Sequence, residues 1–242
     1  MIRVIPEGRL ANNLFQYVFS RVLHDATGLR LDYSVNTSIF STPKLDGSVG
    51  SGEPLVVSDY FDINKDHVLD VPKTIEMCRG KNVVVHGYFQ NKSYFNHRRE
   101  MIKKWLGEIP QSNKSATGIH VRKTDYKAIK WDLPDSFYEE CIKSANPSRL
   151  LVFTDEPEDV YVKTLISRGG ELVQGTPEQS IFLLGTCGKQ IISRSTFSWW
   201  SSFLSSPEKV YYPRPLEGWW SVKDSPHKII EVDSSEYHYV ET

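Results

Sequence analysis

The feature of this sequence that most constrains its fold is the alternation of short apolar runs with helix-forming segments in its second half. Five runs are typical of strands: residues 118–121, 150–153, 171–173, 190–192 and 209–211. Four intervening segments are typical of helices: residues 135–145, 157–168, 178–187 and 197–204. Alternating strands and helices predict a parallel, doubly wound sheet. Ligands of such sheets bind outside the carboxyl ends of the strands, so functional residues are expected there.

The first half predicts a similar but less regular structure. Apolar residues recur at four-residue steps from Leu14 to Ala26, which predicts an amphipathic helix, and Asn12 or Asn13 is expected to cap it. The other expected elements are strands at residues 2–5, 29–33 and 83–87, a loop at 34–54, a helix at about 94–106, a linker at 109–116 and a last strand at 228–232.

Composition and charge exclude several classes of protein. The chain has 242 residues, of which 39% are hydrophobic and 24% charged, and this mixture is typical of a globular protein. A net charge of −1 provides no general attraction for nucleic acid. There is no signal-peptide core, no run of 18 apolar residues and no Cys-x-x-Cys pair among three cysteines. We therefore expect a cytoplasmic protein, soluble or loosely membrane-associated, with no integral membrane span.

The segment His120-Val-Arg-Lys-Thr-Asp-Tyr126 follows the expected strand at 118–121. Residues two apart on a strand share a face, so His120 and Arg122 are expected on one side and Val121 in the core. An arginine at a strand end suits a phosphate, because its guanidinium donates two hydrogen bonds in a fork. The alternative is a surface arginine paired with Asp125.

Two further strand ends carry polar residues. Ser195-Thr-Phe-Ser-Trp-Trp200 opens an expected helix, and the free N–H groups of a helix start bind anions. Ordinary capping by Ser195 or Thr196, with both tryptophans in the core, explains the same pattern. Asp155 follows the strand at 150–153 and suits a hydrogen bond to a ligand N–H, or else an N-cap.

The turn Gly8-Arg9-Leu-Ala-Asn12 joins an expected strand to an expected helix. Neither the Gly-x-Gly-x-x-Gly fingerprint of dinucleotide-binding proteins nor the Gly-x-x-x-x-Gly-Lys-Ser/Thr loop of NTPases occurs in the chain. The histidines show no metal-ligand spacing, so no metal site is expected. A nicotinamide-dependent dehydrogenase and a P-loop NTPase are disfavoured.

Taken together, these motifs resemble those of the α-1,2-fucosyltransferase family, within the superfamily that includes α-1,6- and protein O-fucosyltransferases. The similarity runs in order from Gly8 to about Trp220 and therefore covers most of the chain. Five segments carry it: Gly-Arg-Leu-x-Asn-x-Leu-Phe-Gln-Tyr, Gly-Tyr-Phe-Gln, His-Val-Arg-x-x-Asp-Tyr, Phe-Thr-Asp-Glu and Ser-Thr-Phe-Ser-Trp-Trp.

The resemblance implies an α/β fold of two Rossmann-like domains facing across a cleft, the GT-B type, in a compact version. We expect an N-terminal, acceptor-side domain at residues 1–112 and a C-terminal domain that binds the GDP-sugar at residues 113–242. It further implies GDP-fucose as donor, an oligosaccharide or glycoconjugate as acceptor, inversion at the sugar carbon, and neither metal nor cofactor.

The resemblance also assigns roles to residues. Arg122 would hold the β-phosphate, His120 and Asp155 would lie by the nucleotide, and Gly8, Arg9 and Asn12 would close over phosphate or fucose. Ser195, Thr196, Phe197 and Ser198 would bind phosphate at the helix start. We expect Arg122 and Asp125 to be catalytic, and Glu7, Asp125 and Asp155 are the candidates for a general base.

Some positions depart from the family pattern. Ala11 and Lys123 replace a usual glycine and a usual arginine, and Thr124 is more similar to the α-1,6 and protein O-fucosyl branches. These departures affect the predicted acceptor and linkage more than the predicted donor. Two alternatives stay open: an inverting transferase for another nucleotide sugar, and a non-catalytic glycan-binding module.

Overall fold

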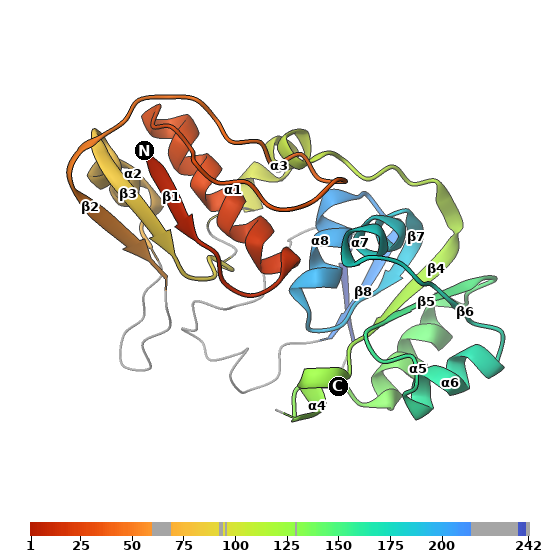
Figure 1. The fold of residues 1–242 in the computed structure, drawn as a ribbon. Coiled ribbons are helices and arrows are strands. Elements are labelled where there is room, and N and C mark those ends of the chain that lie inside the picture. The colour runs from red at the N-terminus through yellow and green to blue at the C-terminus, as the bar shows by residue number, and fades with distance from the viewer. Residues whose placement is uncertain (60–68, 92–93, 95, 129, 214–236, 241–242) are drawn as a thin grey trace. The chain divides into compact units, whose positions relative to one another are not determined.

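The computed structural model describes residues 1–59, 69–91, 94, 96–128, 130–213 and 237–240. These residues form two compact units, residues 1–106 and residues 107–213 with 237–240. Each unit has its own parallel sheet (Figure 1). The limits 1–112 for an acceptor-side domain and 113–242 for a GDP-sugar-binding domain remain predictions.

The first unit is built on a three-stranded parallel sheet in the order β1-β3-β2. Its strands are β1 (Ile2–Ile5), β2 (Ser51–Ser58) and β3 (Lys81–His86). Its helices are α1 (Leu10–Thr27), α2 (Val71–Cys78) and α3 (Arg99–Leu106), the last preceded by the short 3₁₀ helix η2 (Asn96–Arg98).

Helix α1 forms because apolar residues recur along one face, and that face is buried. It ends at Gly28, whose φ of 69° is left-handed and whose N–H donates to the His24 carbonyl oxygen (2.8 Å). The expected asparagine cap is wrong, because the N-cap is Arg9 and no side chain caps the helix. Instead, the Asn13 amide donates to the Glu7 carbonyl oxygen (3.0 Å).

Several other expectations for the first half need correction. Residues 29–33 make only isolated bridges, including Leu31 with Leu45, and not a strand. Strand β2 begins inside the expected loop, and a register shift between Ser51 and Leu55, with Gly52 at φ 73°, hides the strand's alternation from the sequence. Helix α2 was not expected, and α3 begins at Arg99 rather than near Tyr94.

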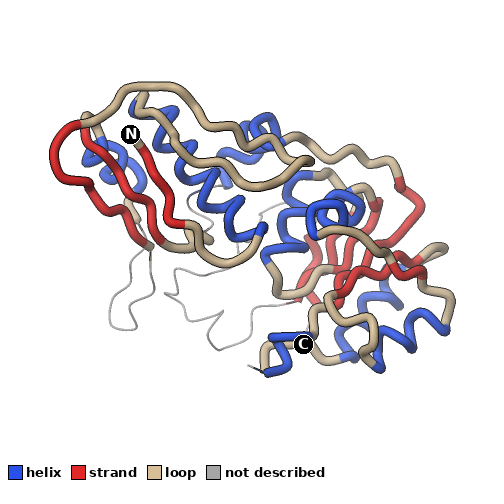
Figure 2. Tube along the Cα trace, viewed as in Figure 1, coloured by secondary structure: helices blue, strands red, loops and turns tan. Residues whose placement is uncertain are grey.

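The second unit contains the predicted doubly wound sheet, whose strands are drawn in red in Figure 2. Its six strands are parallel and lie in the order β6-β5-β4-β7-β8-β9. Counted from β4, this order is 3-2-1-4-5-6, the order of the Rossmann fold. The strands are β4 (Asn113–Val121), β5 (Leu150–Thr154), β6 (Glu171–Leu172), β7 (Cys187–Ile191), β8 (Lys209–Pro213) and β9 (Tyr237–Val240). The prediction of an α/β fold with parallel strands is confirmed.

Helices cover both faces of this sheet (Figure 1). Helices α5 (Asp135–Ala145) and α6 (Val160–Ser167) pack on a core that includes Ile119, Val121 and Val152. Helix α7 (Pro177–Gly185) packs on the other face against Ala116, Leu151 and Phe153, and α8 (Thr196–Leu204) packs beside α7. The short helix α4 (Thr124–Ala128) follows β4 directly and was not expected from the sequence.

Two expectations for the second half are wrong or fall outside the described residues. Strand β4 begins at Asn113, inside the expected linker, where the Asn113 N–H donates to the Thr186 carbonyl oxygen (3.0 Å) and its amide to the Thr186 hydroxyl (2.9 Å). The strand expected at 228–232 lies outside the described residues. Trp199 and Trp200 are buried, which confirms that they belong to the core.

Candidate active site

The candidate site lies at the carboxyl ends of β4, β5 and β7. Strands β4 and β7 are neighbours, and the chain leaves β4 toward β5 on one side and enters β7 on the other. This reversal is the topological switch point, where open α/β sheets bind their ligands. Arg122 follows β4, Asp155 follows β5, and Ser193 to Ser195 follow β7.

Arg122 sits between two carboxylates. Its Nη2 lies 2.6 Å from Asp125 Oδ1, and its Nη1 lies 2.7 Å from Asp155 Oδ2. The guanidinium also lies over the Tyr126 ring, 5.1 Å from its centre. The Arg122 side chain is 14% exposed, whereas that of Asp125 is 51% exposed. The ion pair with Asp125 proposed from the sequence is therefore present, and Asp155 is a second, more buried partner.

Asp155 organises the first turn after β4. Its Oδ1 accepts from the Lys123 N–H (3.0 Å), and its Oδ2 accepts from the Thr124 hydroxyl. Burial raises the pKa of Asp155, but the hydrogen bonds from Thr124 and Lys123 and the charge of Arg122 together hold it below its usual value. The alternative of an N-cap is wrong, since Asp159 caps α6 by accepting from the N–H groups of Tyr161 and Val162.

His120 is buried on the α8 side of the sheet. Its Nδ1 lies 2.9 Å from the Ser193 hydroxyl oxygen, and its ring lies 4.8 Å from that of Phe197. Burial lowers the pKa of His120 to about 3, with Arg122 also lowering it and Asp155 opposing. The side chain is therefore a neutral imidazole at neutral pH. Val121 points into the core as expected.

A side chain caps the start of α8, and phosphate binding there stays a prediction. The Ser195 hydroxyl caps the helix by accepting from the Phe197 N–H (3.3 Å). The Ser198 side chain is fully buried, and its hydroxyl donates to the Ser195 carbonyl oxygen (3.3 Å), which leaves only its backbone N–H for the predicted phosphate contact. Capping and anion binding are compatible here, because a cap satisfies one N–H and leaves others of the first turn.

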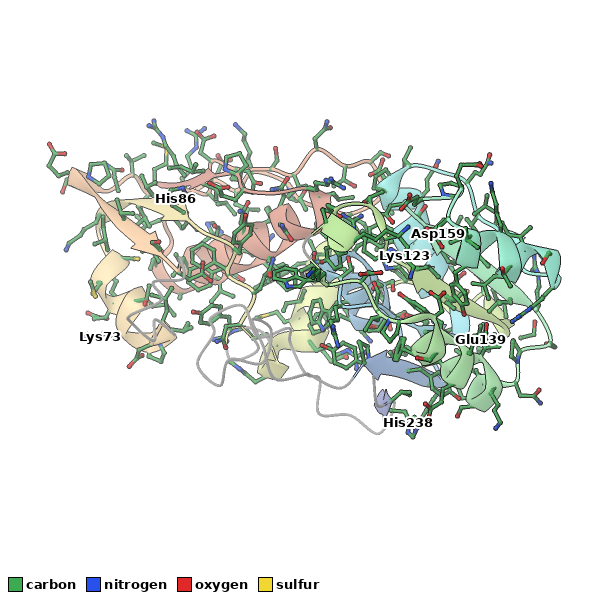
Figure 3. All side chains as sticks on the ribbon, turned by 90° about the horizontal axis from the view of Figure 1, so that it is seen from below. Lys73, His86, Lys123, Glu139, Asp159 and His238 are labelled. Atoms are coloured by element: carbon green, nitrogen blue, oxygen red, sulfur yellow. The ribbon has the colours of Figure 1, made fainter. Side chains whose placement is uncertain are left out.

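Three residues of the His120–Tyr126 segment matter more than the sequence analysis indicated. Thr124 holds Asp155, and the Tyr126 hydroxyl donates to the Arg194 carbonyl oxygen (3.2 Å), which ties the β4 turn to the β7 loop. Lys123, which is labelled in Figure 3, is buried. Its Nζ lies 3.0 Å from Asp135 Oδ1. Their position beside Arg122 in one motif was the signal that could have found them.

The predicted residues of the first unit lie at the β1–α1 turn. Gly8 has a left-handed φ of 73°, and a side chain there would collide with the Asn12 amide. Asn12 Oδ1 in turn accepts from Gln90 Nε2 (3.0 Å), and Arg9 is exposed at the N-cap of α1. Their closure over a donor stays a prediction.

A comparison of the sequence with models of protein families shows to which family the chain belongs. The model of glycosyl transferase family 11 matches residues 55–215, which is more than half of the sequence. The chain belongs to glycosyl transferase family 11. The resemblance drawn from the five motifs is thereby confirmed at the level of the family.

Curated relatives of this family-11 chain carry fucosyltransferase names. It is 22% identical over 252 residues to rat galactoside alpha-(1,2)-fucosyltransferase 1, with 86% of this chain and 64% of the relative covered. It is 21% identical over 249 residues to the human protein of the same name, with 86% and 66% covered. The chain thus spans just under two thirds of the length of these relatives.

A solved structure shares the fold. It is described as NodZ alpha-1,6-fucosyltransferase soaked with GDP-fucose, and it matches with a TM-score of 0.51 at 14% identity. The match covers 86% of this chain and 92% of that one. Within the described part of the family-11 chain, no helix is long and apolar enough to cross a membrane.

Proposed function

We propose that this protein is an inverting glycosyltransferase that moves L-fucose from GDP-fucose to a hydroxyl of an acceptor glycan. The proposed linkage is α-1,2 to galactose, and no metal ion or cofactor takes part. Family membership and the names of the relatives support fucosyl transfer. The single observation that carries the proposal is Arg122, a guanidinium at the switch point of a Rossmann-type sheet, beside a helix start.

In this proposal the donor diphosphate displaces Asp125 from Arg122. Asp125 is the partner that can leave, because its side chain is half exposed, whereas that of Asp155 is 18% exposed and also accepts from Lys123 and Thr124. Asp155 then keeps the guanidinium oriented while the phosphate takes the other side of the fork. The N–H groups at the start of α8 face the same developing charge.

The reaction itself is a single displacement. The acceptor oxygen attacks the anomeric carbon of fucose from the face opposite the GDP, the bond from that carbon to the phosphate oxygen breaks, and the configuration inverts. Negative charge grows on the leaving diphosphate, and Arg122 and the helix start stabilise it without reorganising. Gly8, Arg9 and Asn12 are proposed to approach the donor from a second domain in a GT-B arrangement.

A donor and acceptor panel tests the proposal. The full chain is incubated with GDP-fucose, GDP-mannose or UDP-galactose and with lactose as the acceptor, with and without EDTA, and GDP or UDP release and product are measured. We expect turnover with GDP-fucose alone, no effect of EDTA, and a new α-1,2 bond on galactose by NMR. Turnover with another donor instead would contradict fucose as the transferred sugar. An α-1,6 product would contradict the proposed α-1,2 linkage.

A further inference from the structure

Tyr126 connects the two elements that the proposed donor site uses, and all of its contacts described here lie within the second unit. The Arg122 guanidinium lies over its ring, 5.1 Å from the ring centre. Its hydroxyl donates to the Arg194 carbonyl oxygen (3.2 Å), and Arg194 directly precedes Ser195, the N-cap of α8. One side chain of α4 therefore contacts both the arginine after β4 and the chain that enters α8.

Neighbouring groups hold the Tyr126 ring in place. The Trp131 ring meets it edge to face, with the ring centres 6.0 Å apart, and the Trp131 N–H donates to the Tyr126 carbonyl oxygen (2.8 Å). Helix α4 is also joined to the start of α6, because Lys127 Nζ lies 2.7 Å from Asp159 Oδ2, and Asp159 caps α6. The ring therefore has a defined position beside Arg122.

The Tyr126 hydroxyl keeps its proton at neutral pH. Burial raises the pKa of Tyr126 to about 12, although the charge of Arg122 opposes this. A neutral phenol can donate a hydrogen bond to a carbonyl oxygen, which a phenolate cannot do. The bond to the Arg194 carbonyl oxygen is therefore maintained at neutral pH.

Two residues of the β4 segment hold two successive residues of the loop after β7. His120 Nδ1 lies 2.9 Å from the Ser193 hydroxyl oxygen, and Tyr126 donates to the next residue, Arg194. Ser195 follows and caps α8. A loop held at two successive residues gives the first N–H groups of α8 a defined direction. Donors that are fixed in advance in this way stabilise negative charge without having to reorganise.

The support from Tyr126 becomes more important once a donor is bound. When the diphosphate takes the place of Asp125 in the proposed function, Asp155 and the Tyr126 ring stay against Arg122. An aromatic ring attracts a guanidinium through its π face and carries no net charge. It can therefore orient Arg122 and still leave the positive charge for the phosphate, whereas a further carboxylate in its place would compete with the phosphate.

We propose that Tyr126 is a positioning residue for the donor diphosphate, an inference that rests on the proposed function. Its ring orients Arg122, and its hydroxyl orients the start of α8, so that both groups of donors meet the same diphosphate. Tyr126 takes up no proton and forms no bond in the reaction, because it acts through Arg122 and α8.

The test compares Tyr126→Phe and Tyr126→Leu with wild type in the full chain. Affinity is measured by calorimetry for GDP and by NMR titration for guanosine, which has the same base and sugar but no phosphate. Phenylalanine keeps the ring and removes the hydroxyl, so we expect GDP affinity to fall about three- to tenfold, the effect of one hydrogen bond. Leucine also removes the ring, and the loss should be larger. Guanosine affinity should not change in either variant.

Turnover of GDP-fucose with lactose gives a second readout. Because Tyr126 is proposed to act on the leaving diphosphate, kcat should fall in Tyr126→Phe and fall further in Tyr126→Leu. The KM for lactose should stay at the wild-type value, since the acceptor is bound by other groups. A general loosening of the fold would not produce this separation of kcat from KM.

Thr186→Val is the matched control. It also removes a buried hydroxyl that donates to a carbonyl oxygen, that of Leu183 (2.7 Å). Thr186 directly precedes β7 and so lies at the amino edge of the same sheet, opposite the candidate site. We expect both Thr186→Val and Tyr126→Phe to lower the free energy of unfolding, and only Tyr126→Phe to lower GDP affinity and kcat.

Wild-type GDP affinity in both Tyr126 variants would overturn the inference. Equal losses of GDP and guanosine affinity, or a loss of GDP affinity in Thr186→Val as well, would also overturn it, because each would indicate a purely structural role. If wild type itself neither binds GDP nor releases it from GDP-fucose, the proposed function is wrong, and the role of Tyr126 is wrong with it.

Discussion

At the scale of single residues, Arg122 has the clearest expected effect on turnover. Its guanidinium lies against both Asp125 and Asp155. Removing a donor that stabilises transition-state charge typically costs about 10²–10³ in rate. We therefore expect Arg122→Ala to lower kcat by at least that factor in a GDP-release assay.

Arg149→Ala provides the matched control for this substitution. Arg149 also makes a two-point ion pair, with Glu171 at 2.8 and 2.7 Å, but both side chains are about half exposed and lie at the start of β5 and in β6. We expect wild-type kcat from that variant. Equal effects of the two substitutions would contradict the role given to Arg122.

Because His120 is buried, we expect the free energy of unfolding to depend on pH. Burial lowers its pKa to about 3 in the folded protein, whereas the unfolded chain binds a proton near the usual histidine pKa of about 6.5. Stability is therefore fully present above pH 6.5 and is lost as the pH falls toward 3, at about 1.4 kcal/mol per pH unit. Between pH 7.5 and 5, wild type should lose about 2 kcal/mol more than His120→Gln in urea unfolding. Parallel pH profiles would show that the imidazole titrates normally.

The sequence predicts the residues of one motif better than contacts between motifs. His120, Arg122 and Asp125 lie within six positions, and strand-end logic places them correctly. The cap proposed for Asp155 is wrong because Thr124 and Lys123, about thirty residues earlier, provide better partners. Glu7 Oε1 lies 3.3 Å from His86 Nε2, and this contact joins residues far apart in the chain and depends on strand pairing that the sequence alone does not specify.

At the scale of elements, two capped helices allow the effect of a cap on stability to be distinguished from an effect on ligand binding. The Ser195 hydroxyl caps α8, which follows β7 at the switch point. Thr176 caps α7 through a capping box with Gln179. Loss of either cap should cost about 0.5–2 kcal/mol of stability.

We therefore expect Ser195→Ala and Thr176→Ala to lower the free energy of unfolding by similar amounts, while Ser195→Ala alone weakens GDP binding in calorimetry. Undisturbed GDP affinity in Ser195→Ala would mean that the Ser195 hydroxyl only caps the helix and does not contact the phosphate.

Strands were easiest to predict where helices cover both faces of the sheet. Strand β5 is a nearly continuous apolar run because helices cover both faces of the sheet, and α5 matches its expected range. Strand β2 was missed because it is an irregular edge strand, largely exposed along its first half. The expected linker failed because the polar start of β4 pairs with β7 through backbone groups rather than through apolar side chains.

At the scale of the whole molecule, the central claim is that the second unit binds the GDP part of a fucose donor at its switch point. The alternation of elements predicted the parallel sheet, and its observed strand order places Arg122 and the start of α8 at the edge where ligands bind. The acceptor and the linkage depend on parts of the site that composition and spacing do not specify.

The most direct measurement is calorimetric titration of the full chain with GDP and with UDP, in the presence of EDTA, for wild type, Arg122→Ala and Arg149→Ala. The account predicts that GDP binds wild type and Arg149→Ala equally, that EDTA has no effect, and that UDP binds more weakly. It also predicts that Arg122→Ala loses at least tenfold in GDP affinity. Equal GDP binding by all three proteins, or a preference for UDP, would contradict it.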